Sequence, residues 1–205
     1  MFEFFGDESL PDLIRTVGYL GLFGIVFAES GLFFGFFLPG DSLLFTAGFL
    51  ASQGYLNIWI LLAVLFVAAV LGDNVGYTFG RKVGHKIFSR TDSIFFHKDN
   101  LVRAEKFYEK YGSMTIIIAR FVPIVRTFAP IVAGIGKMSY KVFFLYNLIG
   151  GLLWVLSMTF AGYLLVKIIP DIESHLTLVV GIIIILSILP PIFHFIKEKR
   201  KMGKS

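Results

Sequence analysis

Four charged residues lie in long stretches of otherwise apolar sequence: Glu29, Asp41, Arg120 and Arg126. One such charge at the centre of a membrane helix costs about 2.5–3.5 kcal/mol, so four in contact with lipid would cost on the order of 10 kcal/mol. We therefore expect the carboxylates and guanidinium groups to face one another. Arginine holds a phosphate through two parallel hydrogen bonds, and burial raises the pKa of a carboxyl group so that it can bind a proton. These residue types predict proton-coupled handling of an anion in one site.

Breaks in the helices must bring these side chains together. Arg120 and Arg126 are six residues apart, too far for one face of an unbroken helix, and Pro123 lies between them. The pair Pro39 and Gly40 breaks the other charged segment in the same way. We therefore predict two helical hairpins, and these three residues are secondary candidates for the site.

The composition of the chain is that of a membrane protein. Of its 205 residues 56% are hydrophobic and 16% are charged, and the mean hydropathy is +0.79. Residues 16–72 contain two charges and residues 142–166 contain none, and each stretch exceeds the roughly 20 residues of a spanning helix. The N-terminus is acidic, so we expect the first apolar segment to be retained and not cleaved as a signal. The chain contains no cysteine, which excludes disulfides and thiolate metal sites.

These observations predict an all-α polytopic membrane protein, with about four transmembrane helices and two opposed re-entrant helical hairpins in an inverted repeat. The whole chain is one membrane domain. Its predicted segments are an interfacial N-terminus at 1–12, a first repeat at 13–80 with a hairpin at 29–53, a basic amphipathic linker at 81–113, a second repeat at 114–169 with a hairpin at 114–136, a last transmembrane helix at 176–196 and a basic tail at 197–205.

Basic residues set the expected orientation in the cell membrane. Eight Lys or Arg residues lie between 81 and 110 and more lie in the tail, whereas residues 170–175 contain none. Positive segments stay in the cytoplasm, so we expect the linker and the C-terminus there. The second hairpin then enters from inside, and the first enters from outside if the N-terminus is cytoplasmic. Because the net charge of +5 is concentrated beside membrane ends, nucleic acid is not an expected partner.

An internal repeat agrees with two opposed hairpins. A shift of 91 residues aligns four identical pairs: Gly21 with Gly112, Ala28 with Ala119, Phe37 with Phe128 and Pro39 with Pro130. The same shift places Glu29 on Arg120. Inverted repeats of this kind are typical of secondary transporters.

Several other residues are candidates for the site or for packing. Asp73 serves either the substrate path or only the polar interface, and both alternatives stay open. Glycines 72, 76 and 80 recur every four residues, which favours close helix packing over ligand binding. Trp154 is interpreted as an ordinary membrane residue. The four histidines share no spacing, so no metal site is predicted.

Three motifs, in this order, resemble the DedA family of membrane proteins: Glu29 followed by Pro39-Gly40-Asp41, then GDNVGYTFG at 72–80, then RFVPIVR at 120–126. The resemblance covers nearly the whole chain. It implies two opposed re-entrant hairpins, movement of phospholipid-like anions between leaflets and, in bacteria, recycling of undecaprenyl phosphate for cell-wall synthesis. It also implies that the four charged residues of the hairpins are the family's essential membrane-embedded residues, and that transport depends on the proton gradient.

We therefore expect a proton-coupled flippase for a lipid phosphate, in which two carboxylates exchange protons and two arginines hold the phosphate: Glu29 and Asp41, Arg120 and Arg126. The alternatives are a flippase or scramblase of other specificity and a non-transporting structural or assembly protein. An enzyme is not expected, because a membrane phosphatase usually needs a His beside its arginines and neither hairpin contains one. The expected partners are a lipid phosphate, the membrane and protons, without a cofactor, while a homo-oligomer stays open.

Overall fold

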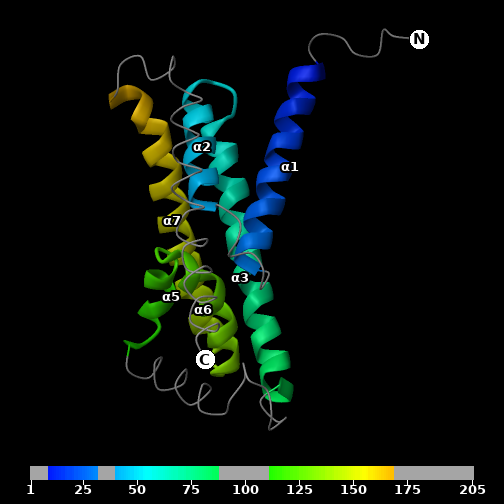
Figure 1. Cartoon of the computed structure of the whole chain (residues 1–205), viewed down its shortest axis with the longest axis vertical. Coiled ribbons are helices and arrows are strands. Elements are labelled where there is room, and N and C mark those ends of the chain that lie inside the picture. The colour runs from blue at the N-terminus through cyan, green and yellow to red at the C-terminus, as the bar shows by residue number, and fades with distance from the viewer. Residues whose placement is uncertain (1–8, 32–39, 88–110, 169–205) are drawn as a thin grey trace, which may run out of the picture.

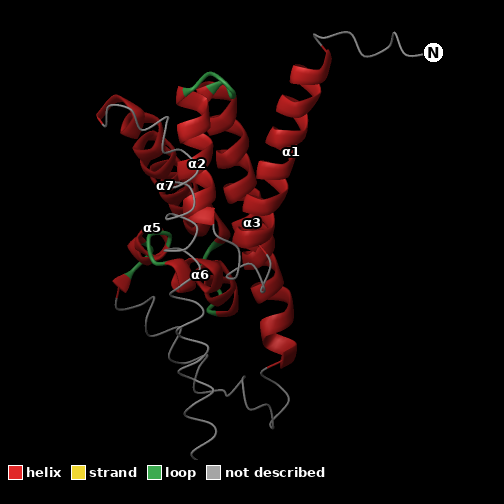
Figure 2. Cartoon of the chain, turned by 45° about the horizontal axis from the view of Figure 1, so that its top comes forward, coloured by secondary structure: helices red, strands yellow, loops and turns green. Residues whose placement is uncertain are grey.

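The structure is a computed structural model that describes residues 9–31, 40–87 and 111–168 (Figure 1). Within these ranges the chain forms helices joined by short turns, and no strand (Figure 2). The helices are α1 (Ser9–Gly31), α2 (Gly40–Ser52), α3 (Ile58–Ile87), α5 (Met114–Ala119), α6 (Pro123–Ile135) and α7 (Tyr140–Ile168). The prediction of an all-helical chain is confirmed for these residues. Most of the predicted linker, the last transmembrane helix, the basic tail and Pro39 lie outside them.

Two of these helices are long and apolar enough to cross a membrane, over Ile58–Lys82 in α3 and Tyr140–Leu165 in α7. An exposed apolar stripe runs along α3, made of side chains four residues apart: Val67, Leu71, Val75 and Phe79. A continuous apolar stripe on the outside of a helix suits contact with lipid better than contact with water. α3 continues as a helix beyond this span to Ile87, through the first basic residues of the predicted linker.

Helix breaks occur where proline and glycine predict them. In the second half α5 ends at Ala119 and α6 begins at Pro123, after Val122 adopts an extended backbone with φ −115° and ψ 105°. Proline suits the first helical position because its missing N–H would have no partner there. In the first half the predicted start of the hairpin is wrong, because α1 continues through Glu29 to its last residue, Gly31.

Two pairs of helices repeat in order and length between the two halves, whereas α1 with 23 residues and α5 with 6 do not match. α2 and α6 each have 13 residues and begin 83 residues apart, at Gly40 and Pro123. α3 and α7 have 30 and 29 residues and begin 82 residues apart, at Ile58 and Tyr140. The predicted offset of 91 is therefore not the one at which the helices repeat. Four identical pairs were too few to set the register, which follows from helix and turn lengths.

The two halves exchange partners in the bundle, because α2 packs mainly against α7 and α6 mainly against α3. Where α2 crosses α7, Gly48 faces the carbonyl oxygen of Thr159, and Gly162 faces that of Phe45. A Cβ atom at either glycine would collide with the opposing backbone. The glycines thus let the two backbones touch.

The crossing of α6 and α3 uses the same arrangement. Gly134 faces the carbonyl oxygen of Tyr77, and Gly80 faces that of Ile131. Each crossing therefore has one glycine on each helix, directed at a backbone carbonyl of the other. The packing role predicted for the glycines on this face of α3 is confirmed. In Figure 1 these crossings place α2 and α6 along different parts of the long helix α3.

We expect the substitutions Gly48→Ala and Gly134→Ala each to lower the free energy of unfolding by roughly 1–3 kcal/mol, because an added methyl group forces two packed backbones apart. Gly21→Ala in α1 is the matched control, since a Cβ there has nothing within 4 Å. That change should be neutral or stabilising by up to about 1 kcal/mol. Thermal unfolding in detergent tests both, and equal effects at the three positions would contradict the crossing contacts.

Candidate functional site

Arg126, near the start of α6, lies between two carboxylates from the first half of the chain. Its Nη1 donates a hydrogen bond of 2.5 Å to Oδ1 of Asp41 in α2, and its Nη2 forms an ion pair with Glu29 at the end of α1. The Arg126 and Glu29 side chains are 9% and 1% exposed, whereas Asp41 is 30% exposed. The three side chains form what we call the Arg126 cluster, which joins α1, α2 and α6.

Gly40 allows the Glu29 carboxylate to lie against the first residue of α2. A Cβ atom at position 40 would overlap the carboxylate. The amino end of a helix carries partial positive charge on its free N–H groups, so this end of α2 favours the nearby negative charge. Gly40 is therefore required by close approach to Glu29 as well as by the break that precedes it.

The formal charges of the Arg126 cluster do not balance. Two carboxylates face one guanidinium, which leaves one excess negative charge. Oε2 of Glu29 is buried and has no hydrogen-bond partner among the described residues. Leaving a buried polar atom unpaired costs free energy. A single proton on either carboxyl group would neutralise the cluster, so this arrangement can bind a proton.

Arg120 lies in a separate group with Asp73 of α3 and Asn147 of α7, which we call the Arg120 cluster. Its Nη2 pairs with Oδ2 of Asp73 and donates a hydrogen bond of 2.5 Å to Oδ1 of Asn147. The amide of Asn147 donates in turn to the carbonyl of Val70 at 3.2 Å. All three polar side chains are buried, and the formal charges of Arg120 and Asp73 cancel. The alternative in which Asp73 only faces the polar interface is therefore wrong.

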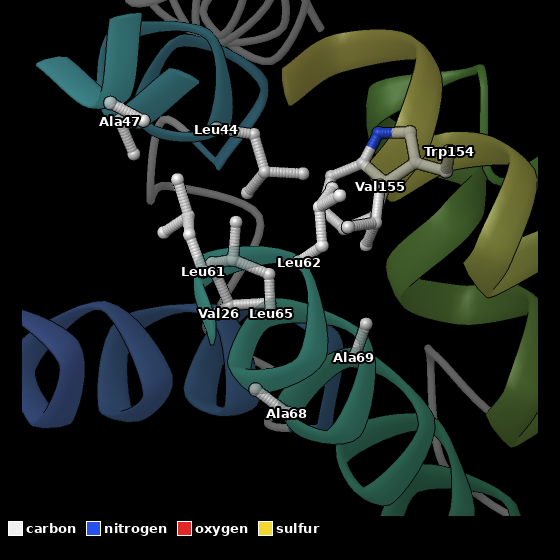
Figure 3. Packing of buried hydrophobic residues seen from close by; sticks show 11 residues of the cluster. Val26, Leu44, Ala47, Leu61, Leu62, Leu65, Ala68, Ala69, Trp154 and Val155 are labelled. Atoms are coloured by element: carbon white, nitrogen blue, oxygen red, sulfur yellow. The ribbon is translucent and has the colours of Figure 1, made fainter. Parts of the chain in front are cut away.

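The structure thus divides the four predicted charges between two clusters instead of collecting them in one. Trp154 of α7 lies between the clusters. Its Nε1 donates to Oδ1 of Asp41 at 2.8 Å, and its ring centre is 4.8 Å from Cζ of Arg126 and 6.0 Å from Cζ of Arg120. A guanidinium over an indole face is attracted by the ring. Figure 3 shows the same indole among buried apolar side chains of the bundle, including Leu44.

Two residues that contact the charged groups, Trp154 and Asn147, were missed in the sequence. The interpretation of Trp154 as an ordinary membrane residue is wrong, because its indole donates to Asp41 and lies against Arg126. A tryptophan in an apolar span carries no sign of such partners. Asn147 did carry a signal, since it is an amide in the charge-free stretch 142–166. An amide there needs hydrogen-bond partners inside the protein.

The secondary candidates are placed as follows. Gly40 contacts Glu29 and Asp73 pairs with Arg120, as described above. Pro123 begins α6 and so sets the start of the helix that carries Arg126. Pro39 lies outside the described residues.

Comparisons with known proteins identify the family. Residues 38–164 match the VTT domain. The chain is 48% identical over 204 residues to Protein DedA of Escherichia coli K12, covering 97% of this chain and 93% of that protein. It is 40% identical over 184 residues to an uncharacterised membrane protein of Mycobacterium leprae (88% and 82% covered), and 35% identical over 182 residues to the inner membrane protein YghB of E. coli K12 (87% and 80%). No solved structure matches the chain. The chain is therefore a membrane protein and belongs to the DedA family of VTT-domain proteins.

Proposed function

We propose that the protein moves a lipid phosphate between the two leaflets of the cell membrane and that this movement is coupled to protons. The observation that carries the proposal is the Arg126 cluster, a buried guanidinium held by two carboxylates with one excess negative charge. Undecaprenyl phosphate is the proposed substrate, in line with the role that the DedA resemblance implies in bacteria.

Arg126 alternates between two sets of partners in this mechanism. Protons on Glu29 and Asp41 remove the negative charges that hold the guanidinium, which then becomes available to a phosphate. The planar guanidinium suits a phosphate because it donates two parallel hydrogen bonds and stays charged. Loss of the protons restores the carboxylates, which compete with the phosphate for Arg126. Because the two sets of partners exclude each other, binding of protons and binding of phosphate are coupled.

Arg120 is the second proposed phosphate ligand, and it lies against the same Trp154 ring as Arg126. Asp73 neutralises it in the described state, and a proton on Asp73 would free it. Asn147 would still hold one edge of the guanidinium, because its amide is anchored to the backbone of Val70. Two arginines together suit a phosphate that carries more than one negative charge.

Access from both sides of the membrane follows from the opposed directions of α2 and α6. Both helices start near the charged centre. α2 leads to the turn before α3, whereas α6 ends beside Tyr77 and Arg81, toward the other end of α3. We infer that they are the inner arms of two re-entrant hairpins, which open the centre to opposite sides. The predicted last transmembrane helix at 176–196 and the predicted cytoplasmic C-terminus lie outside the described residues and stay part of the proposal.

Reconstitution tests the proposal directly. The purified full-length protein is placed in liposomes, and leaflet exchange of undecaprenyl phosphate, phosphatidylglycerol and phosphatidylcholine is measured with and without a pH gradient. We expect exchange of the lipid phosphate that responds to the gradient. Faster exchange of phosphatidylglycerol than of undecaprenyl phosphate would favour the alternative phospholipid flippase, and exchange of none of the three would refute transport.

One observation also favours a structural role, since both arginines form ion pairs with carboxylates of other helices. The substitution Glu29→Gln separates the two functions because it keeps the shape of the side chain and removes its charge and its proton exchange. We expect leaflet exchange to fall at least about tenfold with normal membrane insertion, as for removal of one proton-transfer group. Retained exchange in this variant would show that the Glu29 carboxylate only holds helices together.

A further inference from the structure

The turn that ends α6 contains a lysine in a conformation that favours glycine. Lys137 has a φ of +52°, in the left-handed region. Its N–H donates to the carbonyl of Gly134 at 3.2 Å, and the N–H of Met138 donates to the carbonyl of Ala133 at 3.1 Å. These two bonds define a Schellman motif, whose left-handed residue is usually glycine because a Cβ atom is unfavourable there.

The equivalent turn in the first half contains that glycine. α2 ends in the same motif, with Gly54 at a φ of +80° and hydrogen bonds from Gly54 N to Ala51 O and from Tyr55 N to Leu50 O. Gly54 and Lys137 are 83 residues apart, which is the offset between the starts of α2 and α6. The fold therefore builds this turn with glycine in one half, so the turn itself does not require a lysine in the other.

Lys137 belongs to a group of exposed basic side chains near one end of α3, which we call the basic end: Arg81, Lys82, Lys137 and Lys141. Arg81 is held in place, because its Nη1 donates to the hydroxyl of Tyr77 at 2.8 Å. That hydroxyl donates to the carbonyl of Met138 at 2.5 Å. These bonds tie the guanidinium to the turn that carries Lys137. At the other turn, residues 54–60 contain no charged residue.

The basic end also meets an apolar surface that suits lipid. On α7, an exposed apolar stripe follows Lys141 at intervals of four residues, made of Leu145, Ile149 and Leu153. Tyr140, beside this turn, is 46% exposed, and its ring is 5.7 Å from that of Tyr77. The cationic groups suit lipid headgroups, and the apolar stripe suits acyl chains. An exposed tyrosine is typical of the interface between the two.

We propose that the basic end binds an anionic phospholipid, with its phosphate between Arg81 and Lys137 and its acyl chains along the stripe of α7 that follows Lys141. This site is separate from the two buried clusters and does not depend on transport. Binding of the lipid phosphate accounts for a positive charge at position 137, where the left-handed backbone alone would favour glycine. A soluble phosphate would use the charges but not the stripe, so the lipid is the ligand that accounts for both.

Native mass spectrometry of the full-length protein in neutral detergent, titrated with phosphatidylglycerol, tests the site. Lys137→Gly should weaken binding by about fivefold, the effect of about 1 kcal/mol for one cation near an anionic headgroup. The same substitution should raise the melting temperature without lipid, because glycine relieves the left-handed backbone. Opposite signs in the two measurements are the expected result, and a merely structural lysine would give no change in lipid binding.

Lys167→Gln is the matched control, because it removes one positive charge from the opposite end of α7, and it should leave phosphatidylglycerol binding unchanged. Arg81→Gln is the second variant and should weaken binding by a similar factor to Lys137→Gly. Soluble glycerol phosphate should not displace the lipid. The proposal is overturned if Lys137→Gly and Arg81→Gln bind like the unmodified protein, if Lys167→Gln weakens binding equally, or if glycerol phosphate competes as well as the lipid.

Discussion

Replacing Arg126 with methionine is expected to lower the free energy of unfolding by about 3–5 kcal/mol, because Glu29 and Asp41 then lie close together without a cation. Methionine keeps much of the length of the side chain, so the loss of charge dominates the effect. The destabilisation should shrink as the pH is lowered, because protons neutralise the two carboxylates and remove the need for the cation. Unfolding in detergent over a pH series measures both.

The triple variant Arg126→Met, Glu29→Gln, Asp41→Asn should recover most of this stability, because it removes the whole group of charges instead of one partner. Lys82→Met is the control, since this exposed lysine should change stability by no more than about 0.5 kcal/mol. Leaflet exchange should stay lost in the triple variant, although it folds. If the triple variant is as unstable as Arg126→Met alone, then the cost comes from lost packing and not from unpaired carboxylates.

Local backbone chemistry made part of this fold predictable. Pro123 and Gly40 indicated helix breaks because proline and glycine act on the few residues around them, and α6 and α2 begin at these residues. The need to pair buried charges was equally predictable from their cost. Which charges pair was not, because the partners of Arg126 depend on how α2 packs on α7 and how α6 packs on α3. Those crossings are set by glycine contacts such as Gly48 against Thr159 and Gly134 against Tyr77.

The partners of Arg120 could not be predicted from the sequence either. Asp73 and Asn147 are 74 residues apart in the sequence and meet only because α3 and α7 pack together at the level of Arg120. The predicted offset of 91 rested on four identical pairs of residues, and it placed Glu29 on Arg120. Helix lengths, which no single residue reveals, set the observed offset and leave these two residues in different clusters.

The substitution Asp73→Asn is expected to destabilise the protein by about 3–5 kcal/mol, because it leaves the Arg120 guanidinium buried without a carboxylate. The double variant Asp73→Asn, Arg120→Gln should recover most of that loss, since the described charges of this cluster cancel and can be removed together. Unfolding in detergent measures the two single variants and the double variant as a cycle, and the recovery should exceed the error of additivity, about 0.5 kcal/mol.

Leaflet exchange of the double variant then decides what Arg120 does. If Arg120 holds the phosphate, a stable protein without it should still lose exchange, because Arg126 alone supplies one guanidinium on one side of the Trp154 ring. If exchange returns with stability, Arg120 and Asp73 only fix α5 against α3, and the phosphate depends on the Arg126 cluster alone. The charge balance of the Arg120 cluster is what makes this separation feasible, since removal of one ion pair from the Arg126 cluster would leave a carboxylate without a cation.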